Sequence, residues 1–143
     1  MDNKMFCFQC EQTAGCSGCT GKAGVCGKTA DVAKLQDELT GALIGLARAT
    51  SGATQATPDT WPIFIEGLFT TVTNVNFNEK TIRAMLDRVE TEKAKLASGC
   101  SACASNFDRS DNYDMNELWN AQEDIRSLKS LILFGVRGMA AYA

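Results

Sequence analysis

The sequence of 143 residues contains no histidine. This absence removes His-ligated zinc, His-ligated iron and a histidine general base from the possible functional sites. No run of about 18 apolar residues is present, so no membrane-spanning helix is expected. The net charge is −3, and no basic stripe interleaved with aromatic residues occurs. Nucleic acid is therefore not an expected partner, and neither is a membrane.

The first residues also lack the basic, apolar and small-residue regions of a secretory signal peptide. We therefore expect a cytoplasmic protein, in a reducing compartment where clustered cysteines bind metal or perform redox chemistry rather than form structural disulfides. The odd number of cysteines, seven, agrees with this expectation because one chain cannot pair them all.

Five cysteines lie within twenty residues of one another near the N-terminus: Cys7, Cys10, Cys16, Cys19 and Cys26. Glycine, serine, threonine and alanine fill much of the space between them, and such residues bury too little apolar surface to order the segment. A group bound to the sulfur atoms is expected to supply the missing free energy.

Four thiolates without histidine suit either an iron–sulfur cluster or a structural zinc ion. The gap of two residues between Cys7 and Cys10 lets both reach one metal centre, and the longer gaps to Cys19 and Cys26 let the loop close around it. This spacing favours a cluster. Alternatively, Cys16 and Cys19 form a second CxxC pair for zinc. A thiol–disulfide function is least favoured, because no alternating strand–helix pattern surrounds any CxxC.

The remainder of the sequence predicts an all-α fold, a three- to four-helix bundle with the cysteine-rich loop at one end. Residues 1–28 are expected to form the cluster-binding loop and residues 29–143 the helical bundle, together one domain. N-caps at Thr29, Asn78 and Asp114 mark the starts of three helices, and Thr57-Pro58-Asp59 provides an N-cap and a first-turn proline for the remaining one. The four expected helices span residues 29 to about 50, about 58 to 75, 78 to 99, and 114 to about 142.

From Leu131 onward the last expected helix is apolar nearly all round, and such a helix should be buried on every side. Three preceding helices can cover only one of its faces. We therefore expect a further partner, either a second copy of the chain or additional sequence. Self-association is expected because Leu131, Leu133, Phe134 and Tyr142 cannot all face one bundle.

Three smaller patterns lead to packing interpretations. Gly41 and Gly45 lie four residues apart, and ordinary helix packing is favoured over the close approach of another segment. Phe6 and Phe8 flank the first cysteine and either shield a cluster or anchor the loop to the bundle. A solvated face is the interpretation for the acidic residues Glu79, Asp87, Glu90 and Glu92.

Residues 6–28, FCFQCEQTAGCSGCTGKAGVCGK, followed by Leu35-Gln36-Asp37, resemble the N-terminus of the hybrid cluster proteins, also called prismane proteins or hydroxylamine reductases. The resemblance continues in residues 67–77, 123–128 and 134–142, so it covers nearly the whole chain. It implies that the ligands of an N-terminal cluster are Cys7, Cys10, Cys19 and Cys26.

The short middle gap resembles family members that hold a [4Fe–4S] cubane, whereas members with a longer gap hold a [2Fe–2S] cluster. Cys16 lies outside the pattern and is interpreted as a spare thiol. Cys100 and Cys103 are interpreted as a thiol pair in a variable loop rather than as a second metal site.

Family members are several times longer, and their hybrid iron–sulfur–oxygen cluster uses His, Glu and Cys ligands from later domains. Because this chain has no histidine, it is not expected to build that cluster. It is also not expected to reduce hydroxylamine to ammonia, or nitric oxide, by itself. The resemblance implies a one-electron relay from a redox donor protein towards the hybrid cluster in the remaining domains of the parent enzyme. The alternative is a structural zinc-binding helical interaction module.

Overall fold

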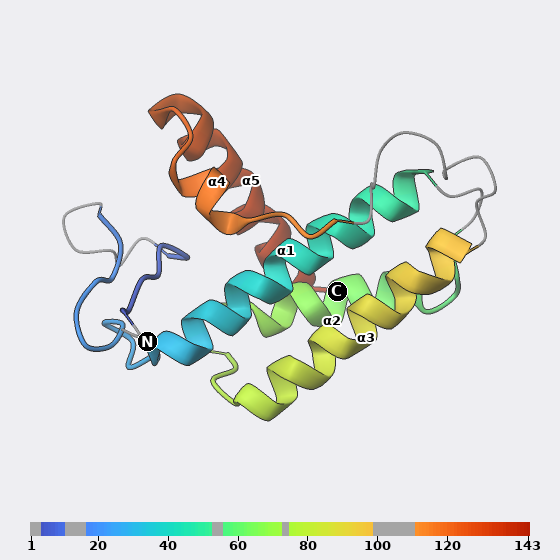
Figure 1. Ribbon diagram of the computed structural model, residues 1–143, viewed down its shortest axis with the longest axis horizontal. Coiled ribbons are helices and arrows are strands. Elements are labelled where there is room, and N and C mark those ends of the chain that lie inside the picture. Colours follow the sequence, from blue (N-terminus) through green and yellow to red (C-terminus); the bar gives the residue numbers. More distant parts are fainter. Residues whose placement is uncertain (1–3, 11–16, 53–55, 73–74, 99–110) are drawn as a thin grey trace.

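The computed structural model of the chain describes residues 4–10, 17–52, 56–72, 75–98 and 111–143. Within these ranges the predicted all-α fold is confirmed, and an isolated β-bridge is present but no strand. Figure 1 shows the N-terminal segment beside the first turns of the longest helix. The helices are α1 (Ala30–Gly52), α2 (Thr60–Thr70), α3 (Glu79–Ser98), α4 (Met115–Trp119) and α5 (Glu123–Ala140).

Three of the predicted N-caps are confirmed by hydrogen bonds to the first turns of their helices, whereas α2 begins at Thr60 with Asp59 rather than Thr57 at its N-cap. Thr29 accepts from a backbone N–H of α1 at 3.3 Å. Asn78 accepts from two backbone N–H groups of α3 at 3.0 and 3.3 Å. Asp114 accepts from a backbone N–H of α4 at 2.9 Å. Each cap supplies a partner to a donor that the helix itself leaves without one.

The predicted last helix is two helices rather than one. Asn120 has a ψ angle of 0° and Gln122 one of 146°, so the chain leaves the helical conformation between α4 and α5. Figure 1 shows the chain turning back here, so that α5 runs alongside α4 and reaches α2. The new helix starts at Glu123 and Asp124, whose negative charges are favourable at a helix N-terminus.

The second helix is also shorter than predicted, because α2 ends at Thr70 rather than at Val75. The hydroxyl of Thr71 donates to the carbonyl of Leu68 at 2.8 Å. The N–H of Thr71 bonds to the carbonyls of Gly67 and Leu68, which closes the last turn. Local hydrogen bonding of this kind competes with continuation of the helix.

Helix α1 is the centre of the bundle and packs against α2, α3 and α4. Its predicted apolar stripe is confirmed, since every member of the stripe is buried. Partners from α2 and α3, including Ile63, Ile82 and Val89, complete this core. The buried stripe consists of Val32, Leu35, Leu39, Leu43 and Leu46.

Gly41 has a more specific role than the packing role predicted for it. The segment before α4 crosses α1 here, and the N–H of Tyr113 donates to the carbonyl of Gly41 at 3.1 Å. A Cβ atom at Gly41 would lie only 2.2 Å from the carbonyl oxygen of Tyr113. Gly41 therefore permits the close approach that fixes the entrance to α4.

Glu92 does not lie on the solvated face predicted for it, because it is fully buried. Its carboxylate accepts hydrogen bonds from the hydroxyls of Thr57 and Thr60 and from Lys95 at 3.3 Å. Burial raises the pKa of Glu92, but these hydrogen bonds outweigh it and hold the pKa below its usual value. The carboxylate thus joins the start of α2 to α3.

The outer side of α5 is an exposed apolar face. Leu131 is 67% exposed and Met139 is 74% exposed, so the neighbouring helices leave this side uncovered, as expected from the sequence. No helix in the described ranges is long and apolar enough to cross a membrane. The apolar face comprises Leu128, Leu131, Ile132, Phe134, Val136 and Met139, and the exposed Tyr142 follows the end of the helix.

The close approach at Gly41 predicts opposite effects for two glycine-to-alanine substitutions. Gly41→Ala should lower the free energy of unfolding by about 1–3 kcal/mol, because the connection to α4 must move. Gly135→Ala in α5, where an added Cβ meets open space, should raise it by about 0.5–1 kcal/mol. Urea unfolding measures both. Effects of the same sign and size would contradict this role of Gly41.

The exposed face of α5 predicts that the isolated chain binds a second copy of itself. Light scattering should give a mass above that of one chain, and Leu131→Glu should lower it because a charge cannot be buried in an apolar interface. Trp61→Glu is the matched control, since Trp61 is a large exposed side chain on α2 and is 60% exposed. A monodisperse monomer for the unchanged chain would contradict the prediction.

Candidate metal centre at the N-terminal cysteine segment

Two of the four predicted ligands are brought together by the backbone. Cys7 and Cys19 pair across an isolated antiparallel β-bridge, with N–H···O distances of 3.2 and 2.7 Å. Gly18 beside this bridge has a φ of +83°, and a Cβ there would lie 3.1 Å from the carbonyl oxygen of Cys7. Only glycine accepts both this conformation and this approach.

The third described segment of the site is a tight turn that contains Cys26. The N–H of Gly24 donates to the carbonyl of Lys28 at 2.8 Å, and the N–H of Gly27 donates to the carbonyl of Gly24 at 2.9 Å. Gly27 has a φ of +84°, the left-handed conformation that favours glycine. This turn carries Cys26 and leads Lys28 into the interior, immediately before α1.

All four predicted ligands are free thiols; Cys7 is buried, and Cys10, Cys19 and Cys26 are half-buried. In the part of the chain that the structure describes, no three Cys, Asp or Glu side chains are gathered as metal ligands. The structure therefore joins Cys7 to Cys19 but does not bring Cys10 and Cys26 into one group with them. The predictions for Cys16, Cys100 and Cys103 lie outside the described residues.

Aromatic side chains anchor the cysteine segment to the bundle. The rings of Phe6 and Phe8 lie 5.1 and 4.9 Å from the ring of Trp119 in α4, measured between centroids. The guanidinium of Arg126 in α5 covers Trp119, with its Cζ atom 4.8 Å from the ring centroid. This geometry favours the anchoring interpretation of the two phenylalanines, because each contact adds stability beyond the area that it buries.

A buried polar network connects Cys7 to α1. Lys28 is only 2% exposed, and its ammonium contacts the sulfur of Cys7 at 3.7 Å and donates to Gln9 Oε1 at 2.9 Å. Gln9 in turn donates from Nε2 to Asp37 Oδ1 at 2.7 Å. The network places the buried positive charge of Lys28 next to the sulfur of Cys7, a predicted ligand.

Arg137 of α5 is a second buried cation near this network and is 7% exposed. Its guanidinium donates to the hydroxyls of Thr71 at 3.0 Å and Thr40 at 2.9 Å, which ties α5 to the end of α2 and to α1. Burial lowers the pKa of Arg137, while the nearby Asp37 and Cys7 act in the opposite direction. The interior beside Cys7 thus contains two cations.

The donor set fits an iron–sulfur cluster. Four thiols without histidine are the ligands that such clusters use, and the cluster with its thiolates is an anion that suits the surrounding positive charge. In the metal-free chain, burial raises the pKa of the Cys7 thiol, although the backbone of Gln9 and the Lys28 charge oppose this effect. A metal that takes the proton's place would give Lys28 an anionic partner.

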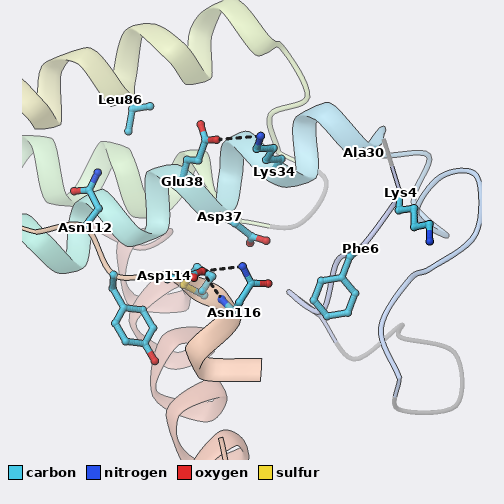
Figure 2. A pocket seen from close by; sticks show the side chains of 12 residues that line it. Lys4, Phe6, Ala30, Lys34, Asp37, Glu38, Leu86, Asn112, Asp114 and Asn116 are labelled. Carbon is cyan, nitrogen blue, oxygen red and sulfur yellow. Dashed lines mark hydrogen bonds and ion pairs between the residues drawn. The ribbon is translucent and has the colours of Figure 1, made fainter. Parts of the chain in front are cut away.

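Two clefts border the site. A cleft of about 610 Å³ lies between α1, the start of α4 and the N-terminal segment. Figure 2 shows Asp37 of α1 and Asn116 of α4 at this cleft, with Phe6 of the N-terminal segment nearby. A second cleft, of about 450 Å³, is lined by Cys10 and Arg137 among others. Asp37 therefore joins the buried network to a solvent-accessible space.

Sequence reasoning missed the network residues Gln9, Lys28, Asp37 and Arg137. All four lie within segments that carry the family resemblance, but no role was predicted for them. One signal was available in Asp37, a charged residue that lies between the buried Leu35 and Leu39 of the α1 stripe. Lys28 gave no comparable signal, because lysine is almost always exposed.

The described part of the chain is thus a helical bundle whose N-terminal segment carries four free thiols beside the two buried cations Lys28 and Arg137. Residues 5–143 match the model of the prismane/CO dehydrogenase family. Because this match covers nearly the whole sequence, the chain belongs to the prismane/CO dehydrogenase family.

Curated relatives agree with this assignment. The chain is 43% identical to the hydroxylamine reductase of Acetivibrio thermocellus, over 97% of the chain and 28% of the relative. It is 40% identical to that of Clostridium perfringens, over 96% and 29%. It is 38% identical to that of Solidesulfovibrio magneticus, over 97% and 29%. The chain thus spans less than a third of the length of these relatives.

Asp37 predicts a pH dependence of stability in the metal-free chain. Burial raises its pKa from 3.8 to about 6, although Gln9, Arg137 and Lys28 oppose the shift. The Asp37 carboxyl therefore loses its proton at a lower pH in the unfolded chain than in the folded chain. The stability that the protonated carboxyl contributes is fully present below about pH 4 and is lost as the pH rises through about 6.

Urea unfolding measured at several pH values tests this assignment. Asp37→Asn keeps an oxygen that accepts from Gln9 but does not titrate, so the fall in unfolding free energy between about pH 4 and 6 should become smaller. A fall of unchanged size in the variant would contradict the assignment to Asp37.

Proposed function

We propose that the chain is the iron–sulfur electron-relay portion of an enzyme similar to the hydroxylamine reductases. The cluster is a [4Fe–4S] cubane held by Cys7, Cys10, Cys19 and Cys26. The observation that carries the proposal is the pairing of Cys7 with Cys19 beside the buried ammonium of Lys28. Membership of the prismane family, which binds iron–sulfur clusters, supports it.

A bound cluster would supply one-electron transfer, and the residues of the chain would supply its environment. The four thiolates would hold the iron, and no side chain is required as a proton donor or acceptor. Phe6 and Phe8, packed on Trp119, keep the ligand segment on the bundle. Burial, nearby charge and hydrogen bonds to sulfur determine the reduction potential of such a cluster.

In the parent enzyme, the proposed relay takes electrons from a redox donor protein and passes them towards the hybrid cluster of the remaining domains. Reduction of hydroxylamine belongs to the whole enzyme, since the chain spans 28–29% of these relatives. The proposed compartment is the cytoplasm, where reducing conditions keep the thiols available.

Serine substitutions test which cysteines hold the cluster. Cys19→Ser is expected to abolish or strongly reduce bound iron and sulfide after anaerobic reconstitution, because a hydroxyl is a poor substitute for a thiolate ligand. Cys16→Ser removes a neighbouring thiol that lies outside the proposed ligand set, so its iron content should match that of the unchanged chain.

Colorimetric iron and sulfide assays measure both variants, and circular dichroism at 222 nm checks that each keeps its helices. Equal iron loss in both variants would contradict the ligand assignment. One bound zinc per chain in place of iron would instead support a structural zinc module.

A further inference from the structure

Lys28 is buried, and no carboxylate of the described residues is in direct contact with it. Among the described residues, each ion pair within 4.0 Å involves other lysines and arginines. The partners of its ammonium are the Cys7 sulfur, the Gln9 amide oxygen and, at 6.0 Å from the centroid, the ring of Phe77. Burying a cation among neutral partners is unfavourable, because the charge loses its hydration without gaining an opposite charge.

Asp37, the carboxylate of the network, is linked to Lys28 by hydrogen bonds only through Gln9. Asp37 is also the carboxylate that acts on the second buried cation, Arg137. Within the described ranges, the hydrogen bonds of the Arg137 side chain go to the neutral hydroxyls of Thr40 and Thr71. Two buried cations therefore share one carboxylate, which leaves an excess of positive charge on the Cys7 side of the network.

We infer that Lys28 is a positioning residue whose ammonium, held by Gln9 and Asp37, directs positive charge at the Cys7 sulfur and raises the reduction potential of the bound cluster. This inference rests on the proposed function. Adding an electron makes a thiolate-bound cluster more negative, and a buried cation at one of its sulfur atoms stabilises that reduced form more than the oxidised form.

The opposite charges at the two ends of the network predict shifts of opposite sign. Lys28→Met keeps a long unbranched side chain but removes the cation, so the potential should become more negative. Asp37→Asn keeps the oxygen that accepts from Gln9 but removes the anion, so the potential should become more positive. Lys22→Met removes a lysine charge from an exposed position of the same segment and should change little, because water and salt screen it.

The experiment is an anaerobic redox titration of the reconstituted chain at pH 8, followed by visible absorbance and by electron paramagnetic resonance. Lys28→Met should change the one-electron reduction equilibrium constant at least tenfold, which corresponds to about 59 mV. Lys22→Met should change it by much less than that. Iron and sulfide are assayed in every sample, so that loss of cluster is not mistaken for a shift in potential.

Each result decides between the two claims. Shifts of opposite sign in the Lys28 and Asp37 variants support the inference, and the Asp37 shift alone does so if Lys28→Met fails to fold or to hold iron. If the unchanged chain binds iron but the Lys28 and Asp37 variants have the same reduction potential as the unchanged chain, the inference is overturned and the proposed function stands. An unchanged chain that takes up no iron overturns the proposed function and the inference with it.

Discussion

The contact between the buried ammonium of Lys28 and the sulfur of Cys7 is the interaction on which the site depends. A lysine at 2% exposure requires compensation, and the partners that the described residues supply are an amide and a shared carboxylate. The proposed cluster, bound through thiolates, would supply the remaining negative charge. The same contact joins the turn that carries Cys26 to the bridge that pairs Cys7 with Cys19.

Helix α1 provides the rigid base for this arrangement. Its leucine stripe is buried against α2 and α3, while Asp37 on the same helix holds Gln9. Gly41 admits the connection that leads to α4, and α4 carries the Trp119 ring on which Phe6 and Phe8 pack. The ligand segment is thus attached to α1 by polar contacts and to α4 by aromatic ones.

Local patterns were the features that the sequence predicted well. The α1 stripe and the caps at Thr29, Asn78 and Asp114 depend on residues within a turn of one another, and all are confirmed. The break after α4 was missed because Leu118 and the later apolar residues keep helical spacing across it.

Contacts between distant residues were not predictable in the same way. The carboxylate of Glu92 is buried against the hydroxyls of Thr57 and Thr60, which lie more than thirty residues earlier in the chain. The sequence of its own helix therefore indicated a solvated position. Lys28 is buried because Gln9 and Cys7 are brought to it by the fold. Spacing and family resemblance predicted Cys7, Cys10, Cys19 and Cys26 as ligands, and of these the structure joins Cys7 and Cys19.

The most direct test of the central claim is analysis of iron, sulfide and zinc in the chain purified without oxygen, with an electronic spectrum recorded before and after dithionite. We predict about four irons and four sulfides per chain and a broad visible band that bleaches on reduction. About two irons and two sulfides per chain would instead indicate a [2Fe–2S] cluster. One zinc ion without visible colour would contradict the electron-transfer account.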